Sequence, residues 1–268
     1  MTSSKKSEVD GEALKAAPDR HYQERLVAFI DIIGFKSIID RTVVDPTYLE
    51  SIIAAISEIR DQFINDRNTA LQKMIRDQLF PDEFETHVIQ VSDCMVISKL
   101  AHPPGALQSL VIDIALAIHI LISHGLLCRG RIERGKVFHS EEYIIGPAYI
   151  AAYLAESAEF VPAVTLSADL QEFGARNQPD NPKLEEYFNH FVIPHIKNTY
   201  FIDYFNDLEG FIDMLEDPIQ HYAGLRDIIE REYNNASDYR VKAKYLWMID
   251  RFNESRIVKD RRLRKLRK

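Results

Sequence analysis

The chain has 268 residues and a formal net charge of −8, with 46% hydrophobic and 28% charged residues. This profile is typical of a globular protein with one sizeable core or one domain with an appendage. Because general nucleic-acid binding depends on a basic face that neutralises many phosphates, the negative charge argues against that class of function.

Residues 1–20 are small, polar and charged, which predicts a disordered segment. No apolar run follows the lysines at the start, so we expect no signal peptide. The two cysteines, Cys94 and Cys128, lie inside apolar runs. We expect free buried thiols, no disulfide framework and a reducing, cytoplasmic location.

The first regular element is residues 26–35, LVAFIDIIGF, an apolar run closed by Gly34. Its short length and its content of Val, Ile and Phe favour a buried central strand. Asp31 is the only acid in this run. A lone carboxylate in a core costs roughly several kcal/mol unless a cation or donors compensate it. Asp31 therefore needs a partner.

Residues 87–100, HVIQVSDCMVISKL, predict a hairpin that turns at the polar pair Ser92-Asp93. If this hairpin pairs beside the first strand, Asp31 and Asp93 converge, and both stay ionised only beside a cation. A divalent metal site is the economical explanation. Taken singly, Asp31 fits a helix cap or a partner of an arginine, and Ser-Asp is common turn chemistry.

Between these strands, apolar residues recur at spacings of three and four from Leu49 to Phe63, after the start signal Asp45-Pro46, and predict a helix. The polar residues 65–85 extend it or loop to the hairpin. After the break Pro103-Pro104-Gly105, residues 106–127 predict a long apolar helix. Asp113, His119 and His124 interrupt it, so we do not expect a membrane span. We expect the sheet and a second subunit to cover it.

The remaining elements follow in order. We expect strands at 126–137, 143–146 and 163–167, a helix opened by Gly146-Pro147, one or two strands in 191–205, and helices at 218–235 and 237–256. The order strand, helix, hairpin, helix, strand predicts an α/β protein with a split βαβ or ferredoxin-like palm plus additions. The basic run 259–268 is expected to be a solvated tail; a contact with nucleic acid, an acidic surface or a partner protein is the alternative.

Four motifs in this order resemble the class III nucleotidyl cyclase catalytic domain: FIDIIGF, SD at the hairpin, RGRIERG and IIGPAYIAAYLAES. More narrowly they resemble the bacterial Pycsar uridylate and cytidylate cyclases, as does KYLWMIDRFN near the end. The resemblance spans residues 26–156, with some support to Asn253. It implies a catalytic domain at 21–175, a strand and helical extension at 176–258 and a basic tail at 259–268.

By this resemblance, Asp31 and Asp93 bridge two divalent ions, Mn²⁺ or Mg²⁺, and the backbone carbonyl of Ile32 is a further ligand. The ions assist attack of a ribose 3′-hydroxyl on the α-phosphorus of a nucleoside triphosphate. The turn at Gly34 and Phe35 leads into a helix whose N–H groups are suited to the β and γ phosphates. Gly34 permits a close approach.

Three arginines lie on or beside one predicted strand, and Arg129 matches the strand arginine of the family. Alternation places Arg129 and Arg131 on one face and Arg134 on the other. A bidentate guanidinium is suited to a transferring phosphate. The structural alternative is that these arginines pair with surface acids such as Glu133.

The helix after Gly146 departs from the purine cyclases, which carry an Asn and an Arg one turn apart where this chain has Tyr149 and Tyr153. The alternative for these tyrosines is a core-facing pair. At the purine-reading position this chain has Ile89, which agrees with a pyrimidine substrate. Tyr48 is a candidate base contact by its position in the pyrimidine cyclases.

The resemblance implies a homodimeric enzyme that makes cUMP, with cCMP second, during phage infection. A separate effector protein reads the product, and neither nucleic acid nor membrane insertion is involved. Two other functions stay open. One is a purine cyclase with the same metal site, and the other is a catalytically silent module that binds nucleotide without releasing pyrophosphate.

Overall fold

The computed structural model describes residues 21–65, 86–196, 198–206, 217–260 and 262–268. The segments predicted as a disordered N-terminus, 1–20, and as most of the link to the hairpin, 66–85, lie outside the described residues. The strands are β1 (Gln23–Ile32), β2 (Thr86–Val91), β3 (Cys94–Leu100), β4 (Cys128–His139), β5 (Ile144–Ile145), β6 (Val164–Ser167), β7 (Val192–Pro194) and β8 (Thr199–Ile202).

The helices are α1 (Phe35–Thr42), α2 (Thr47–Arg60), which continues as a π-helix over Asp61–Asn65, α4 (Ala106–Ser123), α5 (Pro147–Ala158), α6 (Ala168–Arg176), α7 (Pro182–Phe191), α8 (Pro218–Asn235), α9 (Tyr239–Glu254) and α10 (Arg256–Lys259). The helices predicted after Pro46, after Gly146 and at 218–235 are confirmed. Helices α6 and α7 were missed. Ser167 and Asn181 cap them with their side-chain oxygens, and Pro182 opens the second, which are signals present in the sequence.

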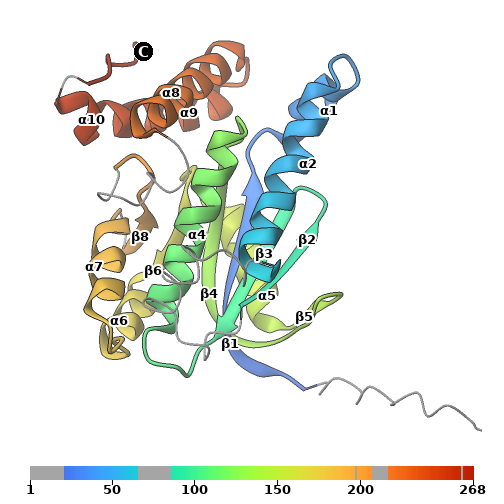
Figure 1. Ribbon diagram of the computed structural model, residues 1–268, viewed down its shortest axis with the longest axis vertical. Coiled ribbons are helices and arrows are strands. Elements are labelled where there is room, and N and C mark those ends of the chain that lie inside the picture. The colour runs from blue at the N-terminus through green and yellow to red at the C-terminus, as the bar shows by residue number, and fades with distance from the viewer. Residues whose placement is uncertain (1–20, 66–85, 197, 207–216, 261) are drawn as a thin grey trace, which may run out of the picture.

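One sheet joins the described strands in the order β2-β3-β1-β4-β6-β8-β7, with β5 added beside β4 (Figure 1). Strand β1 pairs antiparallel with both β3 and β4. The hairpin of β2 and β3 therefore lies beside the first strand, as predicted. The first four strands with their two helical connections form a ferredoxin-like palm, which confirms the expected fold class. Strands β8 and β7 extend the same sheet beyond β6.

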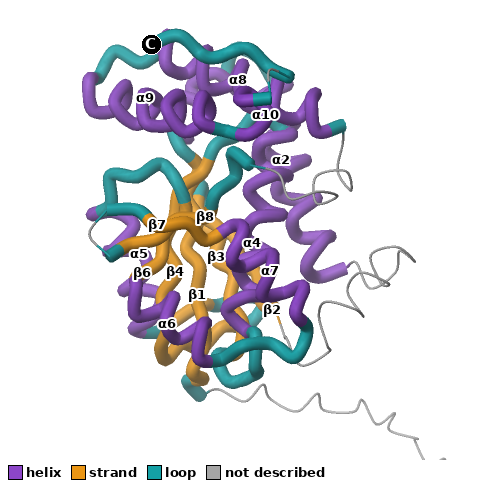
Figure 2. The backbone as a smooth tube through the Cα atoms, turned by 90° about the vertical axis from the view of Figure 1, so that its left-hand side faces the viewer, coloured by secondary structure: helices purple, strands orange, loops and turns teal. Residues whose placement is uncertain are grey.

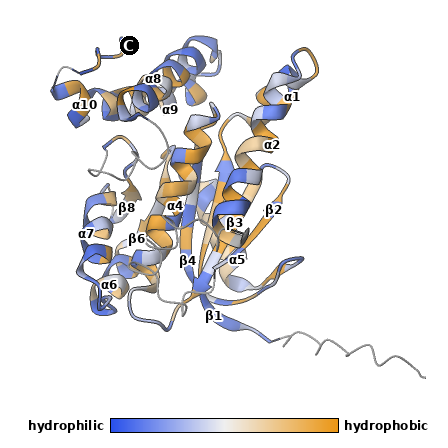
Figure 3. Ribbon diagram, viewed as in Figure 1, coloured by the Kyte–Doolittle hydropathy of each residue, from blue (hydrophilic) through white to orange (hydrophobic). Residues whose placement is uncertain are grey.

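Alternation along β1 separates two packed faces of the sheet. Leu26, Ala28 and Ile30 point into the larger core, which α4 and α2 cover (Figures 1 and 3). Val27 and Phe29 point to the opposite face, where they pack on α5. Because side chains in a strand alternate, Asp31 lies on the α5 face of the sheet.

Helix α4 runs through the larger core, and its apolar character is visible along its length (Figure 3). Its length and composition would suit a membrane span, but 89% of the 18-residue stretch is buried inside the protein. The suggestion that a second subunit covers this helix was wrong, because the sheet and neighbouring helices of the same chain already cover it.

The C-terminal helices α8 and α9 lie across the end of the sheet at which β1 terminates (Figures 1 and 2). The run expected as a solvated tail folds back on α9 instead. Leu266 is buried, its N–H donates to Asn253 Oδ1 at 2.8 Å, and its carbonyl accepts from Asn253 Nδ2 at 3.0 Å. The two leucines Leu263 and Leu266 among the basic residues supply the apolar surface for this contact.

Candidate functional site

Asp31 and Asp93 meet at the end of the central strand. Asp31 is the penultimate residue of β1 and lies opposite Cys94 of β3 and Arg129 of β4. Asp93 is in the two-residue turn between β2 and β3, where Ser92 has a left-handed φ of 58°. The N–H of Ile32 donates to the carbonyl of Asp93 at 3.2 Å, which joins this turn to the end of β1.

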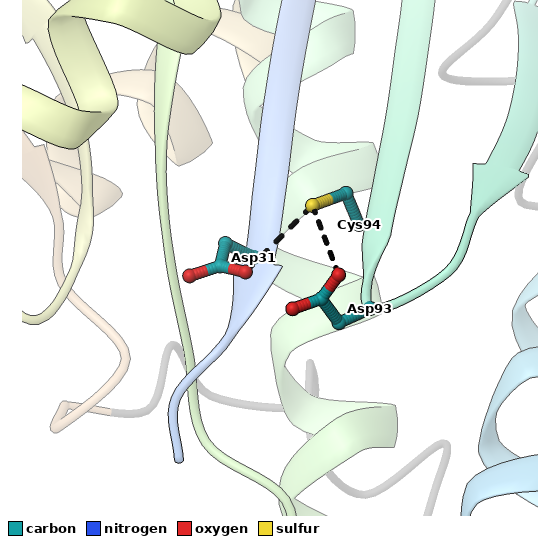
Figure 4. Close-up of side chains that lie close together, drawn as sticks. All are labelled: Asp31, Asp93 and Cys94. Carbon is teal, nitrogen blue, oxygen red and sulfur yellow. Dashed lines mark hydrogen bonds between the residues drawn. The ribbon is translucent and has the colours of Figure 1, made fainter. Parts of the chain in front are cut away.

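The two carboxylates and the thiol of Cys94 form a compact group (Figure 4). Their potential ligand atoms all lie within 4.8 Å of one another. The Cys94 thiol donates to Asp31 Oδ1 at 3.7 Å and to Asp93 Oδ1 at 3.6 Å. Side chains on two neighbouring strand ends thus converge as the sequence predicted.

The donor set fits a hard divalent cation. Burial raises the pKa of Asp31 above its ordinary value of 3.8, although the Arg129 guanidinium opposes this shift. Burial and the two neighbouring carboxylates raise the pKa of the Cys94 thiol to about 12, which keeps it protonated at neutral pH. The available ligands are therefore carboxylate oxygens, which Mg²⁺ and Mn²⁺ prefer, while the thiol acts as a hydrogen-bond donor.

Arg129 connects the Asp31 carboxylate to helix α5. Its Nε lies 3.2 Å from Asp31 Oδ2 and 2.6 Å from Glu156 Oε1. Glu156 is only 4% exposed, and burial raises the pKa of its carboxyl above 4.5 although Arg129 opposes this. The guanidinium is therefore shared between two carboxylates on one face of the sheet.

Sequence reasoning missed Glu156. A signal was present, because the buried residues of α5 are Ala148, Ala152 and Glu156, spaced four apart. An acid that continues an otherwise apolar helical stripe requires a buried cation. The contact between α5 and β4 identifies this cation as Arg129.

The other two arginines of the RGRIERG motif do not join this group. Arg131 pairs with Glu133 along its own strand at 2.8 Å, the structural alternative considered for it. Arg134 lies over the Phe173 ring at 4.4 Å and near Glu24, on the opposite face of β4 as alternation predicted.

Gly34 and Phe35 form the junction between β1 and α1. Gly34 precedes the helix with a left-handed φ of 74° and is exposed, and its carbonyl accepts from the N–H of Ile38 at 3.1 Å. Phe35 is the first helical residue. A residue other than glycine would be strained at this φ, so the position suits glycine on conformational grounds alone.

Tyr149 and Tyr153 lie on α5 against the Phe29 ring, with ring centroids 6.2 and 5.5 Å from it. Phe29 is two residues before Asp31 on the same face of β1. Burial raises the pKa of Tyr149, and the neighbouring Cys94 and Tyr153 contribute to the shift. The core-facing alternative therefore describes the half-buried Tyr149, whereas Tyr153 contacts Phe29 but is 47% exposed.

Tyr48 lies apart from the carboxylates. It lines a cavity of about 170 Å³ between α1, α2, α8, α9 and the turn before β4. The Arg41 guanidinium lies over its ring at 5.8 Å and binds both oxygens of Glu232, at 2.8 and 2.9 Å. Ile33 contributes to this cavity, whereas Asp31, Asp93 and Arg129 do not.

Helix α9 brings two further residues to the end of β1. The hydroxyl of Tyr245 lies 3.9 Å from the position that a Cβ on Gly34 would take. Lys244 is half-buried; burial and the charge of Arg129 lower the pKa of its ammonium, and Glu156 and Asp31 oppose the shift. Neither residue was predicted as part of the site, although both belong to the KYLWMIDRFN segment.

No protein-family model and no curated protein matches this chain. Solved structures of cyclase domains are similar to it. The monomeric guanylyl cyclase domain of the RhoGC fusion protein from the aquatic fungus Blastocladiella emersonii is 14% identical, covers 68% of this chain and 96% of its own, and has a TM-score of 0.40. The adenylyl cyclase CyaB from P. aeruginosa is 13% identical and covers 70% and 96%, with a TM-score of 0.37.

Another similar structure is a class III adenylyl cyclase-like ATP-binding protein from Pseudomonas aeruginosa. It is 12% identical and covers 63% of this chain, with a TM-score of 0.37. The match spans 40% of that protein's own length.

Proposed function

We propose that this chain is a nucleotidyl cyclase that converts a pyrimidine nucleoside triphosphate, UTP ahead of CTP, to the 3′,5′-cyclic monophosphate and pyrophosphate. The observation that carries the proposal is the convergence of Asp31 and Asp93, which were singled out in two separate motifs, at the end of the central strand. The order of the four motifs that resemble class III cyclases supports the same function.

The residues that would hold the metal are Asp31 and Asp93, with the backbone carbonyl of Ile32. When bound, two Mn²⁺ or Mg²⁺ ions stabilise the attacking and the departing oxygens of a phosphoryl transfer. The reaction forms a bond from the ribose 3′-oxygen to the α-phosphorus, breaks the bond to the pyrophosphate oxygen and releases the 3′-hydroxyl proton to solvent. Burial raises the pKa of Asp31, and a bound cation would stabilise the charged form of this carboxylate.

Arg129 is the residue that we assign to the developing charge on the α-phosphate. The Nε of its guanidinium lies beside both Asp31 and Glu156. A guanidinium has five N–H donors, so these two contacts leave donors for phosphate oxygens. The N–H groups at Gly34 and Phe35, at the start of α1, are assigned to the terminal phosphates.

The preference for a pyrimidine rests on the absence of a polar group at Ile89. This residue is half-buried in β2 and packs with Val27 and Phe29 on the face that carries Asp31. An apolar side chain there offers no hydrogen bond to a purine ring. Tyr48 is a candidate contact for the base, because it lines the same cavity as Ile33, which follows the end of β1.

A homodimer fits the outer surface of α5. Ile150, Tyr153 and Leu154 are 50%, 47% and 59% exposed and lie on adjacent positions of this helix, and Val91 of the hairpin is 47% exposed. A second copy that covers this surface would complete a site on the α5 face of the sheet. A role in antiphage defence, with a separate effector protein in the cytoplasm, accompanies the resemblance to the Pycsar enzymes.

The deciding experiment incubates the purified chain with Mn²⁺ and each of UTP, CTP, ATP and GTP, and identifies the products by mass spectrometry. A cyclic pyrimidine monophosphate is expected from UTP. If the product is instead a cyclic purine monophosphate, the pyrimidine preference is wrong, but the proposed cyclisation reaction stands.

A silent nucleotide-binding module is the second candidate. It is favoured by the two contacts that already occupy Arg129 and by tyrosines where purine cyclases carry an Asn and Arg pair. Binding of a triphosphate with Mn²⁺ but no pyrophosphate release from any of the four nucleotides would establish it.

A further inference from the structure

The C-terminal run of the chain concentrates positive charge. Residues 256–268 hold eight of the 33 Lys and Arg residues but only one of the 41 Asp and Glu residues. The net charge of −8, which argues against general nucleic-acid binding, is therefore an average over a chain whose charges are segregated. A local basic surface can bind an anion that the rest of the molecule would repel.

This run is held against the protein by several contacts. Leu266 is 5% exposed, and both its N–H and its carbonyl bond to the side-chain amide of Asn253 on α9. The N–H groups of Arg262 and Leu263 both donate to the carbonyl of Ile257, at 3.0 and 3.2 Å. Because Leu263 and Leu266 pack on the core, the charged side chains of the run are left on the outer surface.

Four cations of this run form a surface that we name the basic ridge: Arg262, Arg264, Lys265 and Arg267. All four are exposed, and within the described parts of the chain none of their side chains has a hydrogen bond or an ion pair. The acids nearest in sequence already have partners. Asp260 pairs with Arg256 at 3.7 Å, and Asp250 pairs with Lys268 at 2.5 Å. The ridge therefore presents its charges to an external anion.

The shape and the composition of the ridge suit a linear chain of phosphates. It lies beyond α9, on the side of the C-terminal helices that faces away from the sheet (Figures 1 and 2). Residues 262–267 span at most about 20 Å, and duplex DNA carries roughly one charge per 1.7 Å of its axis. Three of the four ridge cations are arginines, whose planar guanidinium can bond two phosphate oxygens at once.

We propose that the basic ridge binds the phosphodiester backbone of nucleic acid. Contacts to phosphates position a protein but carry no sequence information, so the binding is independent of base sequence. A linear polyanion meets only the ridge. An anionic membrane, in contrast, is a plane of negative charge that also faces the acidic remainder of the chain, and the resulting repulsion disfavours it.

The test measures binding of a labelled single-stranded RNA, and of a duplex DNA of the same length, to the full chain by fluorescence anisotropy. Replacement of all four ridge cations by Gln should weaken binding by on the order of tenfold or more. For the wild type, a plot of log affinity for RNA against log salt concentration should have a slope of about −3, which corresponds to four phosphate contacts. The matched control carries Gln at four exposed cations elsewhere, Arg60, Lys136, Arg176 and Lys183, and should bind like the wild type.

A further variant, Asn253→Ala, distinguishes a ridge held by the fold from a freely moving basic tail. It keeps every ridge charge but removes both hydrogen bonds to Leu266. Binding should weaken severalfold, because the run must then become ordered when the nucleic acid binds. Thermal melting checks that each variant is folded.

The inference is overturned if the wild type binds neither nucleic acid, or if it binds phosphatidylglycerol vesicles more tightly than both. Unchanged affinity in the ridge variant or in Asn253→Ala would also overturn it, as would an equal loss in the matched control. Because the assay requires no turnover, its result is independent of the proposed cyclisation reaction.

Discussion

Arg129 and Glu156 form the shortest ion pair around the candidate site, with Nε and Oε1 2.6 Å apart on β4 and α5. This pair links the strand that lies beside Asp31 to the helix that covers the sheet. A metal ion can therefore take Arg129's place beside Asp31, because Glu156 still pairs with the guanidinium.

Replacement of Asp31 by Asn should reduce turnover to below about 1% of the wild type, because a neutral amide binds a divalent ion weakly. The fold should persist, since the buried carboxylate is unfavourable in its charged form and Glu156 still pairs with Arg129. Product formation by mass spectrometry and circular dichroism provide the two measurements. Asp40→Asn, at an exposed position of α1, is the control. Full activity in Asp31→Asn would remove this residue from the mechanism.

Binding of Mn²⁺ should raise the thermal stability of the wild type, by about 2.7 kcal/mol when the free ion is at 100 times its dissociation constant. Asp93→Asn should lose this increase, because one of the two carboxylates is then neutral. Melting curves with Mn²⁺ and with a chelator test the prediction. The idea of a metal site between β1 and the hairpin turn fails if Asp93→Asn responds to Mn²⁺ like the wild type.

Arg129→Ala should lower kcat by on the order of 10²-fold or more if the guanidinium stabilises charge on the phosphate. Arg131→Ala is a matched control, because Arg131 is on the same face of β4 but pairs with Glu133. Steady-state kinetics with UTP distinguish the two variants. If Arg129→Ala and Arg131→Ala have equal kcat values, Arg129 has only the structural role of pairing with its neighbouring carboxylates.

Glu156→Gln should lower the free energy of unfolding by about 1–3 kcal/mol, because Arg129 loses the buried counter-charge of its ion pair. It should also lower kcat more than it raises KM, since a less constrained guanidinium serves the transition state poorly. Urea unfolding and kinetics measure the two effects. Glu159→Gln, at the end of α5, should change neither.

Acid should weaken the attachment of α8 to α4. His119 Nδ1 lies 3.0 Å from His221 Nε2, and burial, with a contribution from His221, lowers the pKa of His119 to about 3. The unfolded chain, with a pKa near 6.5, binds more protons between pH 6.5 and pH 3. Stability from this group is therefore complete above pH 6.5 and declines as the pH falls toward 3.

Urea unfolding across this range measures the decline, and His119→Gln should reduce its slope. The slope should not vanish, because burial also lowers the pKa of His139 to about 3. Replacement of the more accessible His124 by Gln serves as the comparison. An unchanged slope in His119→Gln would contradict a neutral buried histidine in the native state.

Local pattern was sufficient for much of the fold. The apolar run around Asp31 predicted β1, the Ser-Asp pair predicted the turn between β2 and β3, and α8 has the bounds read from Pro218 to Asn235. Each of these depends on periodicity and on turn or cap residues within a few positions. The pairing of the hairpin with β1 was predicted from topology, and it is what joins the two acids.

Other features depended on contacts between distant segments. The basic run at the C-terminus has the composition of a solvated tail, yet Leu266 docks on Asn253 and the α9 surface. Helix α4 has the composition of an interface helix, yet its own chain buries it. Composition shows how much apolar surface a segment can bury. It does not show which other segment of the protein covers that surface.

The sequence by itself determined the central strand, the hairpin, most of the helices and the two acids that the central strand and the hairpin turn carry, because alternation and turn chemistry act over a few residues. Only the tertiary structure decided that Glu156 pairs with Arg129, that Tyr48 lies in a separate cavity and that Tyr245 lies beside Gly34. The partners in these contacts are separated by tens of residues or more. Their distances are set by the packing of whole elements, which no local pattern encodes.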